Sequence, residues 1–217
     1  MTIVGLTGNL ASGKSEAAKM FKKKGAHVID ADKVAREVTQ KNASLRRAIA
    51  KTFGKEFLLK SGQLDRRKLA WHVFSKPKDL KKLNVLVHPG AIVEAMKQIE
   101  KLRSKKGLVI LDVPLLFESK MDKVADFTVV ITANESHMLS RASRRGIPSA
   151  LARKILAAQW PVMKKARMAD FVIQNNGTLE ELEKNIERVK REILKRQAAR
   201  ESGFYGTPQK IKSKEEK

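Results

Sequence analysis

The stretch GNLASGKS at residues 8–15 decides the fold of this chain. It follows a short apolar run, TIVGLT at 2–7, and precedes a helical pattern that runs from Lys14 to Lys24. Its spacing fits G-x-x-x-x-G-K-[ST], the P-loop, in which glycines let successive backbone N–H groups approach one phosphate. The alternative is a strand-to-helix turn that merely tolerates glycine. A strand before the motif and a helix after it favour the P-loop, because the helix N-terminus adds further N–H groups and a positive dipole end.

The residue types in the motif predict a task for each position. Lys14 is expected to reach the β- and γ-phosphates of ATP and to take part in catalysis, and the Ser15 hydroxyl is expected to hold Mg²⁺. We expect the backbone N–H of Glu16 to bind phosphate while its side chain points away. The predicted nucleotide-binding residues are Gly8, Ala11, Ser12, Gly13, Lys14, Ser15 and Glu16.

Short apolar runs alternate with long helical patterns along the rest of the chain. This alternation predicts an α/β protein of the P-loop NTPase fold, with a five-stranded parallel sheet and helices on both faces. Helices are expected at Lys14–Lys24, from Pro89 onward, and after a capping box formed by Thr178 and Glu181. The expected strands are 2–7, 27–30, 108–113, 127–132 and 170–174.

The spacing of the strands predicts one P-loop domain over residues 1–196 that carries two helical insertions, and the chain size suits a small-molecule kinase with substrate and lid insertions. Its core is expected at 1–32, 106–134 and 166–196. Residues 33–105 contain no clear strand and are too long for a simple crossover, so they predict a helical substrate-binding insertion. Residues 135–165, rich in arginine, predict a lid. Apolar periodicity ends near residue 197, so 197–217 is expected to be a disordered basic tail.

The charge of the chain is strongly positive, with 46 Lys and Arg against 23 Asp and Glu, a net charge of +23. Such a field favours anionic partners, and a solvated lysine-rich surface is the equally weighted alternative. The absence of cysteine excludes a disulfide framework and Cys-based metal sites, which agrees with a cytoplasmic location. No apolar run reaches 18 residues and the start has no secretory pattern, so we expect no membrane partner.

Several longer segments resemble the dephospho-coenzyme A kinase family, in the family's order and over most of the chain to about residue 195. The resemblance implies transfer of the γ-phosphoryl group of ATP to the ribose 3′-hydroxyl of dephospho-coenzyme A, the last step of coenzyme A synthesis. The enzyme would then be a phosphotransferase with an alcohol acceptor. The segments are GLTGNLASGKS (5–15), HVIDADKVAREV (27–38), GQLDRRKLAWHVF (62–74), HPGAI (88–92), LDVPLLFES (111–119) and ARMADFVIQNNG (166–177).

Two aspartates follow predicted strands, where ligands collect in open α/β sheets. Asp32, just past the second strand, is the candidate to orient the attacking hydroxyl and accept its proton, in agreement with the family's pattern. The alternative is that Asp32 caps the following helix, and Asp30 is a weaker candidate for the base. Asp112 is expected to support Mg²⁺ through water or to hold Ser15, with a strand-end cap as the alternative.

Four further residues are predicted to contact the acceptor substrate. Arg66 is expected to meet a substrate phosphate, with a solvated role equally weighted. His88, in the family's His-Pro pair, is expected on the substrate side, although a lone histidine more often packs or caps. Leu115 and Glu118 line the substrate cleft by resemblance, and Glu118 alternatively lies on the surface.

Three arginines in the second insertion predict cations over the transferred phosphate, because arginine stays charged and binds phosphate bidentately. Arg141 and Arg145 are the predicted catalytic lid residues. The spacing to Gln159 does not choose between Arg144 and Arg145, and a solvated helix face is the alternative for all three.

Two rival functions are compatible with parts of the sequence. The nearer one is another P-loop kinase that acts on a nucleotide or small metabolite. The other is a nucleic-acid-binding protein, which the low aromatic content of 5% disfavours because bases need stacking platforms. We therefore expect dephospho-coenzyme A as the partner, ATP and Mg²⁺ as cofactors, no nucleic acid as main partner, and a monomer.

Overall fold

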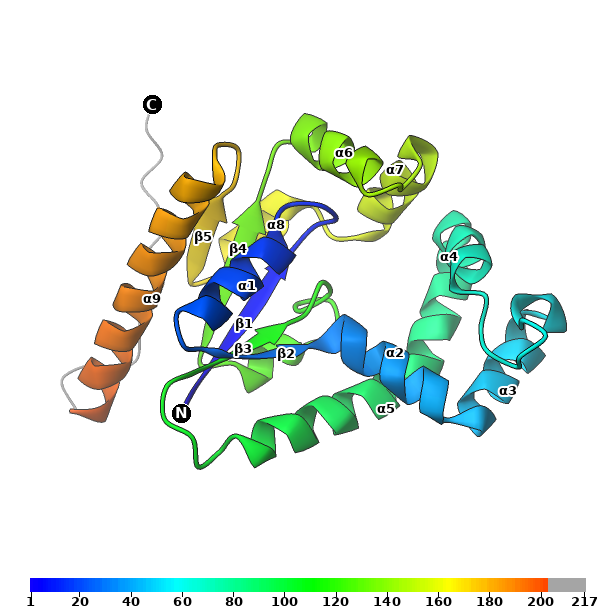
Figure 1. Ribbon diagram of the computed structural model, residues 1–217, viewed down its shortest axis with the longest axis horizontal. Helices are drawn as coiled ribbons and strands as arrows, with labels where there is room; N and C mark the ends of the chain where they lie inside the picture. The colour runs from blue at the N-terminus through cyan, green and yellow to red at the C-terminus, as the bar shows by residue number, and fades with distance from the viewer. Residues whose placement is uncertain (203–217) are drawn as a thin grey trace.

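The computed structural model describes residues 1–202, and these form one five-stranded parallel sheet in the order β2-β3-β1-β4-β5 (Figure 1). The expected strand positions are confirmed to within one residue at either end. The bounds are β1 Thr2–Gly8, β2 His27–Asp30, β3 Leu108–Asp112, β4 Phe127–Thr132 and β5 Phe171–Gln174. Because β1 is the central strand, the P-loop that follows it lies at the middle of the side of the sheet where the strands have their carboxyl ends.

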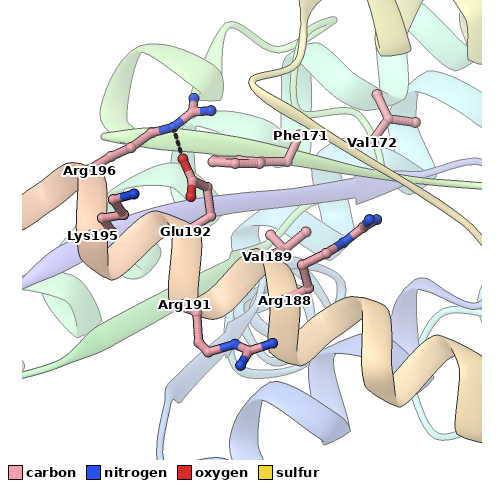
Figure 2. Close-up of a pocket in the computed structure, with 8 residues that line it drawn as sticks. All are labelled: Phe171, Val172, Arg188, Val189, Arg191, Glu192, Lys195 and Arg196. Carbon is pink, nitrogen blue, oxygen red and sulfur yellow. Dashed lines mark hydrogen bonds and ion pairs between the residues drawn. The ribbon is translucent and has the colours of Figure 1, made fainter.

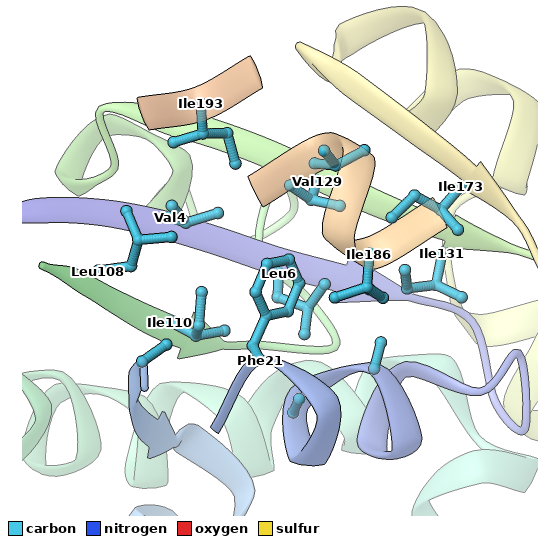
Figure 3. Packing of buried hydrophobic residues seen from close by; sticks show 14 of the residues in the cluster. Val4, Leu6, Phe21, Leu108, Ile110, Val129, Ile131, Ile173, Ile186 and Ile193 are labelled. Carbon is cyan, nitrogen blue, oxygen red and sulfur yellow. The ribbon is translucent and has the colours of Figure 1, made fainter. Parts of the chain in front are cut away.

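Helices cover both faces of the sheet, as expected. On one face α1 (Lys14–Lys23) and α9 (Leu179–Glu201) place Phe21 and Ile186 against Leu6, Ile110 and the other buried strand residues (Figure 3). On the other face α5 (Pro77–Lys101) and α8 (Val162–Met168) pack against a second apolar cluster. Near-continuous Val, Ile and Leu in β3 and β4 follow from this two-sided burial.

The segment between β2 and β3 is helical, as predicted, and extends to one side of the sheet (Figure 1). It contains α2 (Ala31–Lys41), α3 (Ala43–Phe53), a 3₁₀ turn η1 (Lys55–Phe57), α4 (Arg66–Ser75) and α5. Its own apolar cluster includes Ile49, Phe57 and Leu69. Asp65 accepts the backbone N–H of Lys68 and starts α4.

The prediction that Pro89 opens a helix is wrong, because Pro89 lies inside α5 and Pro77 occupies the first turn. Proline fits the first turn of a helix, whereas an interior proline cannot donate to the carbonyl four residues earlier. Tertiary packing on both sides of Pro89 compensates for that loss. Before it, Leu83 and Val87 pack in the cluster of the insertion; after it, Ala95 packs in the cluster against the sheet.

The second insertion is also helical and contacts the P-loop. It comprises α6 (Glu135–Arg144) and α7 (Ser149–Ala158), with α8 beyond them; a 3₁₀ turn, η2 (Met121–Val124), precedes β4. Leu10 and Ala11 of the P-loop pack against Ala142 and Ala152 of α6 and α7. These two helices lie at the top of the view in Figure 1.

The C-terminal helix extends further than the sequence predicted. The capping box of Thr178 and Glu181 starts α9, as expected, but the helix continues to Glu201, so the predicted disordered tail cannot begin at 197. Side-chain bonds four residues apart support this last part, with Arg196 donating to Glu192 over 2.8 Å and Gln197 to Glu201 over 2.8 Å. The remainder of that tail prediction, residues 203–217, lies outside the described residues.

No helix within residues 1–202 has both the length and the apolar character that a bilayer-crossing segment needs. The two long helices, α5 with 25 residues and α9 with 23, both carry many charged side chains. Each buries only one stripe against the sheet or the insertion, so their length follows from packing inside the protein.

Candidate active site

The P-loop has the backbone that a phosphate cradle requires. Ala11 and Gly13 both have positive φ, 56° and 102°, and Ser12 N–H donates to the carbonyl of Asn9 over 3.1 Å. A Cβ built on Gly13 would fall on Nδ2 of Asn175, so this position needs glycine for its conformation and for space. The Ser12 side chain is buried, and its Oγ has no hydrogen-bond partner within the described part of the chain. A buried hydroxyl of this kind fits a phosphate-bearing ligand.

Two residues from distant parts of the sequence hold the P-loop from outside. Asn175, directly after β5, donates its side-chain amide to the Ser12 carbonyl over 2.7 Å. Arg141 donates to the Asn175 carbonyl over 2.9 Å and to the Ser12 carbonyl over 3.5 Å. Burial lowers the pKa of Arg141, and the charges of Arg144 and Arg145 lower it further. Arg141 thus lies at the loop, whereas Arg144 and Arg145 are exposed near it.

Lys14 reaches across the P-loop and forms an ion pair with Asp112 at the end of β3. Asp112 is 3% exposed, and burial raises the pKa of its carboxyl, opposed by Lys14 and increased by Asp30 and Asp32. Asp30 is the register partner of Asp112 on the neighbouring strand. Lys14 therefore pairs directly with Asp112, and its charge also opposes the rise in the pKa of Asp32. Ser15 is exposed at the start of α1.

Asp32 lies in the first turn of α2 without capping it. The cap is Asp30, whose carboxylate accepts the backbone N–H of Lys33 over 3.0 Å, so the capping alternative for Asp32 is wrong. The Asp32 residue is exposed, yet protein atoms lie close enough to its carboxyl for desolvation to raise its pKa. Lys14 and Arg36 oppose this rise and Asp30 adds to it. A raised pKa suits a group that takes up a proton.

A pocket of about 100 Å³ opens beside Asp32 between α2, α5 and the loop after β3. His88 and Leu115, two of the predicted substrate residues, line it together with apolar side chains such as Ile92. Burial lowers the pKa of His88, so its imidazole is neutral at pH 7 and offers hydrogen bonds without charge.

Two predicted substrate residues do not line this pocket. Arg66 donates to the backbone carbonyl of Arg36 over 3.0 Å, and burial and the charge of Arg36 lower its pKa. Glu118 turns away from the pocket into the protein, where its carboxylate contacts Lys165 over 2.9 Å and accepts the backbone N–H of Trp160 over 3.1 Å.

Comparison with known proteins identifies the family. The family model for dephospho-CoA kinase matches residues 2–181. The chain belongs to the dephospho-CoA kinase family. It is 36% identical over 187 residues to the dephospho-CoA kinase of Enterococcus faecalis, covering 86% of this chain and 94% of the relative. It is 41% identical over 198 residues to that of Arabidopsis thaliana, covering 89% and 84%.

Solved structures of the family and of other P-loop kinases share the fold. Dephospho-CoA kinase from Campylobacter jejuni superposes with a TM-score of 0.66 at 26% identity, covering 90% of this chain and 98% of that one. A shikimate kinase from Acinetobacter baumannii, at 15% identity and a TM-score of 0.52, covers 90% and 94% and shares the fold alone. The expected P-loop α/β fold and the expected resemblance are thereby confirmed.

Sequence reasoning missed three residues that shape the site. Asn175 carries the signal already used for Asp32, a polar residue directly after a strand. Lys165 follows Val162 by three residues, so it occupies an apolar-stripe position of α8, where a charge signals a buried partner. Arg36 gave no such signal, since exposed arginines on helices are common.

A second and larger cleft of about 460 Å³ lies between β5 and α9 (Figure 2). Arg188, Arg191 and Lys195 line it, beside Phe171 and Val172. Arg196 lies over the Phe171 ring, 4.6 Å from the centroid, and pairs with Glu192 over 2.8 Å. None of the residues described above for the P-loop or for the pocket beside Asp32 lines this cleft.

Proposed function

We propose that this protein transfers the γ-phosphoryl group of ATP to the ribose 3′-hydroxyl of dephospho-CoA, which yields CoA and ADP. One observation carries the proposal within the family assignment: Lys14 of the P-loop pairs with Asp112 at the end of β3, and the neighbouring strand β2 ends beside Asp112 and leads directly to Asp32 at the pocket. A phosphate donor held by the loop and an alcohol held in the pocket would therefore meet between them. Phosphoryl transfer depends on such positioning.

ATP would be held by the backbone from Gly8 to Glu16 and by Lys14. The positive φ at Gly13 and the buried, unpartnered Ser12 Oγ support this assignment, because both fit a phosphate cradle. The oxygens of Ser15 and Asp112 are the donor type that Mg²⁺ prefers, with Asp112 acting through water. Mg²⁺ would supply neutralisation of phosphate charge when bound.

Asp32 would accept the proton of the 3′-hydroxyl. Its place at the pocket mouth and its raised pKa support this role. His88 and Leu115 would hold the acceptor inside the pocket, while Arg66 would meet an acceptor phosphate at the rim. Glu118 would act on the acceptor through the loop after β3 rather than by touching it.

Arg141 and Arg145 would stabilise charge on the transferred group, with residues 135–165 acting as a lid. The contact of Arg141 with the Ser12 carbonyl supports the first of these roles. Residues 33–105 would form the substrate-binding insertion of a single kinase domain. We also propose that the enzyme works as a monomer in the cytoplasm.

Product analysis tests the proposal. Purified protein with ATP and Mg²⁺ is assayed for ADP with and without dephospho-CoA, and the product is identified by mass spectrometry. Dephospho-CoA-dependent ADP release with CoA as product is the expected result. Phosphorylation of a nucleoside monophosphate, with none of dephospho-CoA, would overturn it.

A further inference from the structure

Lys165 is a lysine with no exposed side-chain surface. Its Nζ donates to the Pro114 carbonyl over 2.9 Å and lies 2.9 Å from Oε1 of Glu118. Burial lowers the pKa of Lys165, and the contact with Glu118 opposes this change. Fully buried lysines are rare, and an apolar pair of similar volume would often be as stable as a buried ion pair. We therefore look for a role of the buried Lys165 ammonium group other than stabilising the fold.

Glu118 and Lys165 join the acceptor loop, defined here as residues 113–119, to α8. Pro114, whose carbonyl Lys165 contacts, and Leu115 both line the acceptor pocket beside Asp32. The same carbonyl accepts the Thr7 hydroxyl of β1 over 3.0 Å. A single carbonyl of the acceptor loop is thus fixed from two sides.

A second branch leads from Glu118 to the P-loop. Glu118 accepts the backbone N–H of Trp160 over 3.1 Å. The Trp160 carbonyl accepts the Asn9 side chain over 3.2 Å, and Gln159 accepts the backbone N–H of Leu10 over 2.9 Å. Residues 159–160, which follow α7, therefore contact both the acceptor loop and the phosphate loop.

We propose that the buried pair of Lys165 and Glu118 is a positioning element that fixes the acceptor loop relative to the P-loop, so that Lys165 sets the affinity for the acceptor alcohol. This inference rests on the proposed function. Lys165 acts through the Pro114 carbonyl and Glu118 and touches neither substrate. Loss of its amine removes one of the two hydrogen bonds on the Pro114 carbonyl and the ion pair with Glu118, so the loop that carries Leu115 loosens, whereas the branch from Glu118 to the P-loop can persist.

Two variants and a control test this role. Lys165→Met removes the amine, and Lys165→Met combined with Glu118→Gln avoids leaving an uncompensated buried carboxylate while keeping an acceptor for Trp160. Arg167→Met is the control, because it removes one exposed cation from the same helix. Melting temperatures are recorded for all variants so that activities refer to folded protein.

In the double variant we expect the KM for dephospho-CoA to rise about tenfold, while the KM for ATP changes less than about threefold, because only the acceptor loop is released. The control keeps both values. Equal changes in both KM values, or an unchanged KM for dephospho-CoA in the double variant, would overturn the proposal.

Hydrogen exchange of the ligand-free protein separates this inference from the proposed function. Faster amide exchange across residues 113–119 is expected in the double variant and not in Arg167→Met. Unchanged exchange contradicts the positioning role even if the enzyme phosphorylates dephospho-CoA. If wild-type protein does not phosphorylate dephospho-CoA, the proposed function fails, whereas exchange still decides whether Lys165 holds the loop.

Discussion

The P-loop end of the sheet and the cleft between β5 and α9 differ in how their cationic side chains are paired. At the P-loop end two lysines are buried in ion pairs: Lys14 pairs with Asp112, and Lys165 pairs with Glu118. In the β5–α9 cleft, Arg188, Arg191 and Lys195 form no ion pair with any other residue in 1–202 (Figure 2).

The cleft between β5 and α9 is also the larger of the two, about 460 Å³ against about 100 Å³ for the pocket beside Asp32. The site proposed for phosphoryl transfer is therefore neither the larger cleft nor the one with the most unpaired positive charge. It is distinguished instead by buried groups with shifted pKa values and by contacts between segments that are far apart in the sequence. The following predictions test this contrast, from the largest expected effect to the smallest.

Lys14→Ala should have the largest effect, because it removes the proposed phosphate contact and leaves Asp112 buried without its partner. We expect kcat/KM to fall on the order of a thousandfold or more. Steady-state ADP release measures this. Lys19→Ala, an exposed lysine on the same helix, should keep wild-type activity, and a loss of less than tenfold in Lys14→Ala would contradict the assigned role.

Asp32→Asn should reduce kcat by roughly a hundredfold to ten-thousandfold, since it removes the proton acceptor. The same change should leave the melting temperature unchanged or raise it. The folded-state pKa of Asp32 is raised, so ionisation costs stability as pH rises from the ordinary value of 3.8 through the raised value, and Asn avoids this cost. Glu37→Gln, also on α2, serves as the control for both measurements.

The pH profile of kcat/KM, which reports pKa values of the free enzyme, gives a finer test of Asp32. The base must be ionised, so activity should fall as pH decreases through the pKa of Asp32, with a slope of about tenfold per pH unit. Because desolvation raises that pKa, the acid limb should lie above pH 3.8. An acid limb at or below the ordinary aspartate value would separate Asp32 from the base role.

Asn175→Ala should weaken ATP binding about tenfold with a smaller effect on the acceptor, since it removes the hydrogen bond that holds the Ser12 carbonyl. Titration calorimetry with a non-hydrolysable ATP analogue measures the change. Asn176→Ala is the matched control, because Asn176 contacts Asn134 and not the P-loop. Equal affinities in the two variants would show that the outer support of the loop is dispensable.

Arg191→Ala should have the smallest effect. It lies in the β5–α9 cleft with no ion pair recorded in residues 1–202, so kcat and both KM values should stay within about twofold of wild type. A tenfold loss of activity would show that the cleft between β5 and α9 contributes to catalysis, which would contradict this prediction.

The sequence predicted the sheet and the P-loop well because both depend on short-range patterns. Runs of Val and Ile mark strands buried on both faces, and the glycine spacing marks the phosphate loop directly. Asp32 and Asp112 were predicted as site residues for the same reason, since Asp32 lies two residues past β2 and Asp112 ends β3. These signals need only a few neighbouring residues.

The features that were predicted wrongly depend on contacts between residues far apart in the sequence, which local patterns do not predict. Pro89 appears to open a helix when its neighbours alone are considered, yet packing on both sides carries the helix through it. The Glu118 side chain was predicted to face substrate, but its partner Lys165 lies 47 positions further along the chain. Residue-level roles in the acceptor cleft therefore stay predictions until the variants are measured.

Pro89 also lies where one helix passes from one apolar cluster to another. The half before it belongs to the cluster of the insertion, and the half after it to the cluster against the sheet. A helix that lacks a hydrogen bond at such a junction bends there most easily. His88 and Ala91, on either side, line the acceptor pocket. A bend at this proline would therefore move His88 and Ala91 relative to each other and change the width of the pocket beside Asp32.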